Sequence, residues 1–134
     1  MNPFRRLRLP REIKDALGVL DELATIFDPG AFRLVRTHVE GGFRRYPREF
    51  VSMVGQDTPV RQIVLQAVSN TAGDLVESGE YHIYRGVLDP MGPGDHLLKI
   101  YDATTQELVR MGVVDPAYAE TQRQGLRKNI AMIG

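Results

Sequence analysis

Proline and glycine divide this chain into segments of helical length. Three residue pairs stand directly before stretches in which apolar residues recur at helical spacing: Asp28-Pro29, Thr58-Pro59 and Asp115-Pro116. An Asp or Thr side chain can accept a hydrogen bond from a free backbone N–H group at a helix start. Proline is tolerated in the first turn, because the N–H that it lacks would have no partner there. The pattern therefore predicts helices that begin at these three pairs.

Glycines stand where these stretches are expected to stop, because glycine enters the left-handed conformation that ends many helices without strain. They are Gly41-Gly42, Gly55, Gly79 and Gly112. Together with the apolar spacing, they predict helices over residues 10–27, 29–40, 47–54, 58–78, 95–111 and 116–132. Residues 49–54 also fit a β-strand by propensity, although we favour a helix. The predicted fold class is all-α, a compact bundle of about five or six helices.

One glycine does not fit this pattern. Gly18 lies in the middle of the first predicted helix, where glycine costs about 1 kcal/mol relative to alanine. Close approach of a neighbouring helix would explain it, and we favour that explanation over a hinge.

Residues 79–95 interrupt the helical pattern with a long irregular loop. The segment contains two tyrosines, a histidine and an arginine within five residues: Tyr81, His82, Tyr84 and Arg85. These residue types are common at protein interfaces and in ligand pockets. His96 follows just beyond the loop and is grouped with them. We take these five residues as candidates for binding a ligand or a partner, while packing of the tyrosines over the helices is the alternative.

Two arginine clusters are weaker candidates for binding a polyanion. They comprise Arg5, Arg6 and Arg8 near the N-terminus, and Arg44, Arg45 and Arg48 around the second helix end. Arginine binds phosphate groups bidentately and stacks on bases. However, acidic residues lie close to both clusters and the net charge of the chain is zero. Intramolecular ion pairs or a solvated rim are therefore favoured over nucleic-acid binding.

No pattern that carries catalysis, a metal or a cofactor is evident. The absence of cysteine excludes disulfides, thiolate nucleophiles and cysteine-ligated metals. The three histidines, His38, His82 and His96, fall on separate predicted elements, so we expect no metal site. We expect neither a catalytic residue nor a cofactor.

The length and composition suit one ordinary globular domain. We expect a single helical domain over residues 1–134, with residues 1–9 as a flexible N-terminal arm. The sequence has neither the apolar run of a secretory signal nor that of a membrane span, so we expect a cytoplasmic protein that does not bind membranes.

These observations favour a small interaction or accessory protein, regulatory in role, that binds a protein partner or associates with itself. A small-ligand or enzymatic domain with a pocket at Tyr81–Arg85 is one alternative. Nucleic-acid binding through the arginine clusters is another, and it is less favoured. Whether the chain is an enzyme is left open, leaning toward no.

Overall fold

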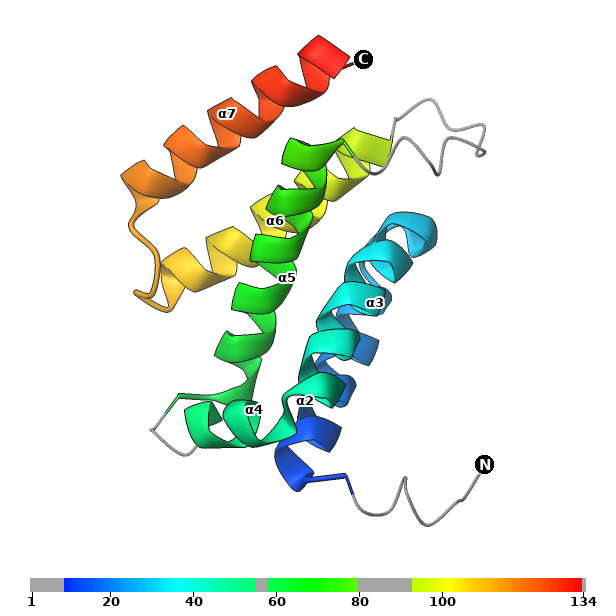
Figure 1. Ribbon diagram of the computed structural model, residues 1–134. Helices are drawn as coiled ribbons and strands as arrows, with labels where there is room; N and C mark the ends of the chain where they lie inside the picture. Colours follow the sequence, from blue (N-terminus) through cyan, green and yellow to red (C-terminus); the bar gives the residue numbers. More distant parts are fainter. Residues whose placement is uncertain (1–8, 55–57, 80–92, 134) are drawn as a thin grey trace.

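The computed structural model describes residues 9–54, 58–79 and 93–133. Within these ranges the chain forms helices and no strands, which confirms the predicted all-α bundle (Figure 1). The helices are α2 (Arg11–Ala24), α3 (Pro29–Arg45), α4 (Pro47–Val54), α5 (Val60–Ser78), α6 (Pro93–Arg110) and α7 (Pro116–Ile133). Residues 49–54 belong to α4, so the favoured helix is correct there and the strand is not.

Helix α5 is the centre of the bundle, because it contacts all five other described helices. It has α3 on one side and α7 on the other in Figure 1. Most turns of α5 contribute buried residues to the core: Ile63, Val64, Leu65, Val68, Ser69, Ala72, Leu75 and Val76. By contrast, α7 contacts only α5 and α6 within the described ranges, and Leu126 is its only fully buried hydrophobic residue there.

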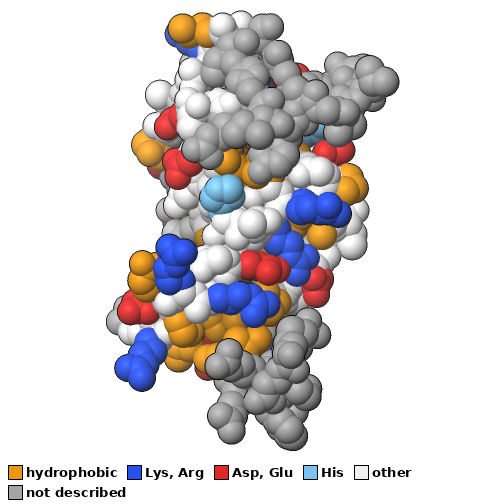
Figure 2. Space-filling model, turned by 45° about the vertical axis from the view of Figure 1, so that its right-hand side comes forward, with side chains coloured by type: hydrophobic (Ala, Val, Ile, Leu, Met, Phe, Trp, Pro, Cys, Tyr) orange, Lys and Arg blue, Asp and Glu red, His pale blue; other side chains and the backbone are white. Residues whose placement is uncertain are grey.

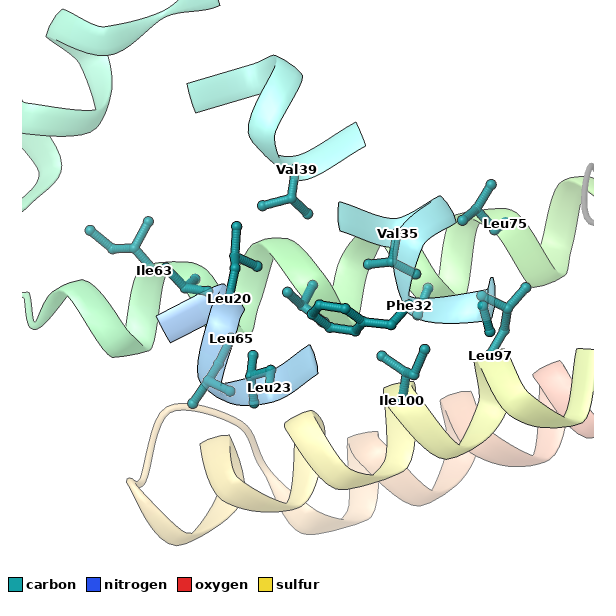
Figure 3. Packing of buried hydrophobic residues seen from close by; sticks show 14 of the residues in the cluster. Leu20, Leu23, Phe32, Val35, Val39, Ile63, Leu65, Leu75, Leu97 and Ile100 are labelled. Carbon is teal, nitrogen blue, oxygen red and sulfur yellow. The ribbon is translucent and has the colours of Figure 1, made fainter. Parts of the chain in front are cut away.

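The hydrophobic core lies between α2, α3, α5 and α6. Figure 3 shows Phe32 of α3 at its centre, between Val35 and Ile100. Phe32, Val35 and Ile100 are almost completely removed from solvent. Burial of one such side chain contributes about 1.5–3 kcal/mol, so contacts of this kind hold the helices together.

Two of the three predicted helix starts have the expected cap. Asp28 Oδ2 accepts a hydrogen bond from the backbone N–H of Ala31 at 3.0 Å, and Asp115 Oδ2 accepts one from Tyr118 at 3.1 Å. The prediction for Thr58-Pro59 is wrong in detail. Helix α5 begins at Val60, Pro59 occupies the cap position, and no side chain caps this end. The proline thus precedes the helix here instead of forming its first turn.

The predicted glycine stops are confirmed at two positions. Gly79 and Gly112 have φ angles of 70° and 77°, in the left-handed region that glycine favours. The predicted stop at Gly41-Gly42 is wrong, because α3 continues to Arg45. Extension of α3 buries Phe43 in the core, which outweighs the helix propensity lost at the two glycines, about 2 kcal/mol together. Gly55 lies outside the described residues.

Other predicted boundaries shift by a few residues. The first helix ends at Ala24, earlier than the predicted Phe27, whose ring stacks on Phe32 at a centroid distance of 5.8 Å. Helix α6 begins at Pro93, so Asp95 lies in its first turn and not in the preceding loop. The rest of the predicted loop, residues 80–92, lies outside the described part of the chain.

The explanation that we favoured for Gly18 is also wrong. A methyl group placed on its Cα would meet no atom within 4 Å outside its own helix, so no neighbouring helix approaches closely there. Gly18 therefore lowers the helix propensity of α2, and no close contact in the described structure compensates for this loss.

Alanine substitutions at two glycines should shift stability in opposite directions. Gly18→Ala should raise the free energy of unfolding by about 0.5–1 kcal/mol, because alanine favours the helix and meets open space. Gly112→Ala should lower it by about 1 kcal/mol, because a φ of 77° strains a residue with a side chain. Urea unfolding measures both. Destabilisation by Gly18→Ala would show that the glycine has a role in the fold.

One ion-pair network ties three helices together. Arg61 of α5 binds Glu107 of α6 through two hydrogen bonds, Nε to Oε1 at 2.5 Å and Nη2 to Oε2 at 3.1 Å. Its Nη1 also lies 3.1 Å from Oε2 of Glu22 in α2. The hydrogen bonds from Arg61 lower the pKa of Glu107, against a smaller opposing effect of partial burial.

The pairing makes stability depend on pH in the acid range. Because the pKa of Glu107 is lower in the folded state, its contribution is complete above about pH 5.5 and disappears as the pH falls through the folded pKa. Glu107→Gln should cost about 1 kcal/mol at neutral pH, a modest value because both side chains are partly exposed. The difference from wild type should shrink toward pH 3, as measured by urea unfolding.

Glu77→Gln is a matched control, because Glu77 has no ion-pair partner within the described ranges. Loss of stability by Glu107→Gln that stays constant down to pH 3 would contradict a role for the ion pair.

Candidate functional site

Most of the predicted aromatic site lies outside the described residues. Tyr81, His82, Tyr84 and Arg85 fall in the range 80–92, so their convergence with His96 stays a prediction. His96 lies in the first turn of α6, with Nε2 4.0 Å from Oδ1 of Asp28 and its side chain 18% exposed. Because Asp28 caps α3, this contact links the starts of two helices.

The second arginine cluster lies at the corner between α3 and α4. Arg44, Arg45 and Arg48 are all exposed there. The only ion-pair contact of this cluster in the described chain is from Arg44 Nε to Glu40 Oε2, at 4.0 Å, while Glu40 Oε1 binds Arg36 more closely at 2.6 Å. These cations are therefore largely unneutralised. Arg5, Arg6 and Arg8 lie outside the described residues, so polyanion binding stays a prediction.

The surface has a hollow of about 500 Å³ between α3, α4 and α5, here called the α4 hollow. Its floor is apolar, with the rings of Phe43 and Phe50 4.5 Å apart at an angle of 50°. Tyr46 and Met53 line it while 55% and 49% exposed. Its other lining residues are His38, Val39, Gly42, Glu49, Ile63, Gln66, Ala67, Asn70 and Thr71. Figure 2 shows hydrophobic and basic side chains together toward the lower end, where α4 lies in Figure 1.

A second hollow of about 400 Å³ lies between α5, α6 and α7, here called the α7 hollow. Ser69 and Thr105 are buried in its lining, with their hydroxyl oxygens 2.7 Å apart. Tyr101 packs beside them, and burial raises the pKa of its hydroxyl group. The other lining residues are Gln66, Asn70, Gly73, Asp74, Glu77, Leu108, Val114, Tyr118, Gln122 and Leu126.

The two hollows meet along the exposed side of α5, because Gln66 and Asn70 line both of them. The helix has no charged residue from Gln62 to Gly73. Arg61 precedes this stretch, nine residues before Asn70, which places the two on opposite sides of a helix with 3.6 residues per turn. We call Gln62, Gln66, Asn70 and Gly73, with the two hollows beside them, the α5 face.

A third hollow of about 290 Å³ lies between α6 and α7. Arg123 in its wall donates a hydrogen bond from Nε to Asp102 Oδ2 at 3.0 Å. This bond raises the pKa of Arg123, and the two charges neutralise each other. This hollow is smaller than the other two. Its main charged pair, Arg123 with Asp102, is already formed within the chain.

The described residues hold no group of three or more histidine, aspartate or glutamate side chains that could bind a metal ion. None of the helices in these ranges is both long and apolar enough to cross a lipid bilayer. His38 lines the α4 hollow, with Nδ1 2.9 Å from the backbone oxygen of Leu34.

Sequence reasoning missed the residues of the α5 face. The signal that could have revealed them is the run of twelve uncharged residues from Gln62 to Gly73, which is long for a helix with an exposed side. The wide apolar stripe of this helix predicted its central position in the bundle. It gave no indication of a binding surface on the side of Gln66 and Asn70.

The lining of the α4 hollow should separate into residues that support the fold and residues that do not. Phe50→Ala should cost about 3–4 kcal/mol, because Phe50 is 3% exposed and packs on Phe43. Met53→Gln should cost less than about 0.5 kcal/mol, because half of Met53 is exposed. Thermal and urea unfolding measure both. A large loss with Met53→Gln would assign this rim to the scaffold and remove it as a binding surface.

Neither a protein-family model, nor a curated protein, nor a solved structure matches this chain.

Proposed function

We propose that this chain is a protein-interaction domain of accessory or regulatory type, which binds its partner through the α5 face. The observation that carries the proposal is the uncharged surface of α5 between two hollows, where Gln66 is half-buried and Asn70 is exposed. A helix whose exposed side only meets water usually carries charged residues there. The cores of protein interfaces, in contrast, are depleted in charge and enriched in aromatic residues and methionine.

The side chains around the α4 hollow fit this description. Tyr46 and Met53 each expose about half of their surface beside an apolar floor. Such partly exposed side chains over a preformed hollow are typical anchor points for a partner. Gln66 and Asn70 can donate and accept hydrogen bonds at the centre of the contact without the desolvation cost of a charge.

The shape of the face favours a helical partner. Both hollows run beside α5 and are bordered by further helices, α3 and α4 on one side and α6 and α7 on the other. An amphipathic helix binds such a groove by placing apolar side chains into it at intervals of three or four residues. We therefore expect the partner segment to be helical.

Site-specific photo-crosslinking tests the proposal. A benzoylphenylalanine placed at Asn70, which is exposed in the centre of the α5 face, should give a covalent protein adduct in cells of the native source. The same residue placed at Lys14, which is exposed on α2, is the matched control and should give none. Tyr46→Ser combined with Met53→Gln should reduce the adduct at Asn70 severalfold. Adducts of equal yield at both positions, or none at Asn70, would contradict the proposal.

A further inference from the structure

We infer that the partner of the α5 face is an amphipathic helix of another protein, with one apolar half that enters the α4 hollow and one basic half that binds Asp74 and Glu77 at the α7 hollow. The inference rests on the proposed function, which it makes specific by stating the chemistry of the partner. Two features of the described residues carry it: the positions of the two hollows along α5 and the difference in charge between them.

The two hollows follow one another along α5. The α4 hollow borders α5 from Ile63 to Thr71, and the α7 hollow borders it from Gln66 to Glu77. In Figure 1, α4 lies beside the start of α5 and α7 lies beside its end. A helix that crosses α5 obliquely over Gln66 and Asn70, as packed helices usually do, therefore passes from one hollow to the other. Its two halves meet different side chains.

The α7 hollow is negatively charged. Its described lining includes the carboxylates of Asp74 and Glu77 and no lysine or arginine. Both carboxylates are exposed, and neither has an ion-pair partner within the described ranges. Residues three apart on a helix are neighbours, so these two like charges weaken the helix unless a cation lies between them. A lysine or arginine side chain of a partner would be attracted to both.

The basic residues of α7 do not fill this role within the described part of the chain. Arg123 binds Asp102 of α6 at 3.0 Å, and Arg127 and Lys128 are not among the lining residues of the α7 hollow. Asn129 reaches α5, but its Nδ2 donates a hydrogen bond to the backbone oxygen of Glu77 at 3.3 Å and not to the carboxylate. The two carboxylates thus stay available to a partner.

Two tyrosines make the α7 hollow still more suitable for a basic side chain. Tyr101 and Tyr118 both line it, and Tyr118 is 61% exposed. Burial is the main cause of the raised pKa of Tyr101, and the charge of Glu77 adds to it, so the field of this carboxylate extends into the hollow. Tyrosine rings attract guanidinium and ammonium groups. An acidic side chain would be repelled here.

The α4 hollow favours the apolar half of the partner. Phe43 and Phe50 form its floor, and Tyr46 and Met53 expose about half of their surface at its rim. Its one carboxylate among the described lining residues, Glu49, lies in the first turn of α4, where the helix dipole stabilises a negative charge. The second arginine cluster lines neither hollow, but at the corner beyond this rim it would repel a basic group.

Sequencing of the photo-adducts by mass spectrometry tests this polarity. Benzoylphenylalanine placed at Met53 should form its adduct with the apolar half of the partner helix in cells of the native source. Placed at Tyr118, it should form its adduct with the basic half of the same helix. Both positions are partly exposed, and both already carry a large apolar side chain.

Removal of the two charges tests the role of the carboxylates. Asp74→Asn with Glu77→Gln should reduce the adduct yield at Asn70 severalfold, because both substitutions keep the size of the side chain and remove its charge. Glu12→Gln with Asp15→Asn, on α2, is the matched control and should leave the yield unchanged. Unaltered circular dichroism and thermal unfolding would show that every variant is folded.

A synthetic peptide with the sequence of the crosslinked segment provides a measurement in solution. Its dissociation constant from the purified chain, by fluorescence anisotropy, should rise roughly fivefold with Asp74→Asn and Glu77→Gln. Added salt should weaken binding to the wild-type chain more than binding to this variant, since salt screens the charges that the variant lacks.

Each outcome decides the inference. A crosslinked helix with its basic half at Tyr118, together with weaker binding after charge removal, supports it. A partner without basic residues, the reverse polarity, a second copy of this chain as the partner, or binding unchanged by charge removal would contradict it. In those four cases an adduct at Asn70 still supports the α5 face as a binding surface. If no adduct forms at Asn70, both proposals fail.

Discussion

The structure depends on the burial of one side of α5 against all the other described helices. This helix contributes eight buried residues, and the core side chains of α2, α3 and α6 pack onto them. Removing apolar surface from water is the dominant favourable term in folding, so the helix with the most neighbours organises the fold. The Arg61–Glu107 pair then holds α5 against α6 at the edge of this core.

The same central position also leaves part of α5 at the surface. Neighbours on both sides leave a strip of its surface exposed between α3 and α7, and the angles at which these helices pack leave a hollow on each side. Burial accounts for most of the uncharged stretch from Gln62 to Gly73, because Asn70 is its only exposed residue, while Gln62, Gln66 and Gly73 are half-buried. The α5 face that contains these residues is the surface that we propose for a protein partner.

Local sequence signals predicted the fold well where they act locally. Asp28 and Asp115 cap their helices as expected, and Gly79 and Gly112 end theirs with positive φ angles. The prediction failed at Gly41-Gly42, because the burial of Phe43 acts through contacts distant in sequence. The hollows could not be predicted from the sequence, since they arise from the packing angles between helices. The uncharged stretch from Gln62 to Gly73, in contrast, is visible in the sequence.

Native-state hydrogen–deuterium exchange tests the central position of α5 most directly. Backbone amides in the middle of α5, around Val68, should be the slowest to exchange in the chain, because they open only on global unfolding. Amides of α7 should exchange much faster, since Leu126 is its only fully buried hydrophobic residue in the described ranges. Exchange of α5 as fast as that of α7 would contradict the account.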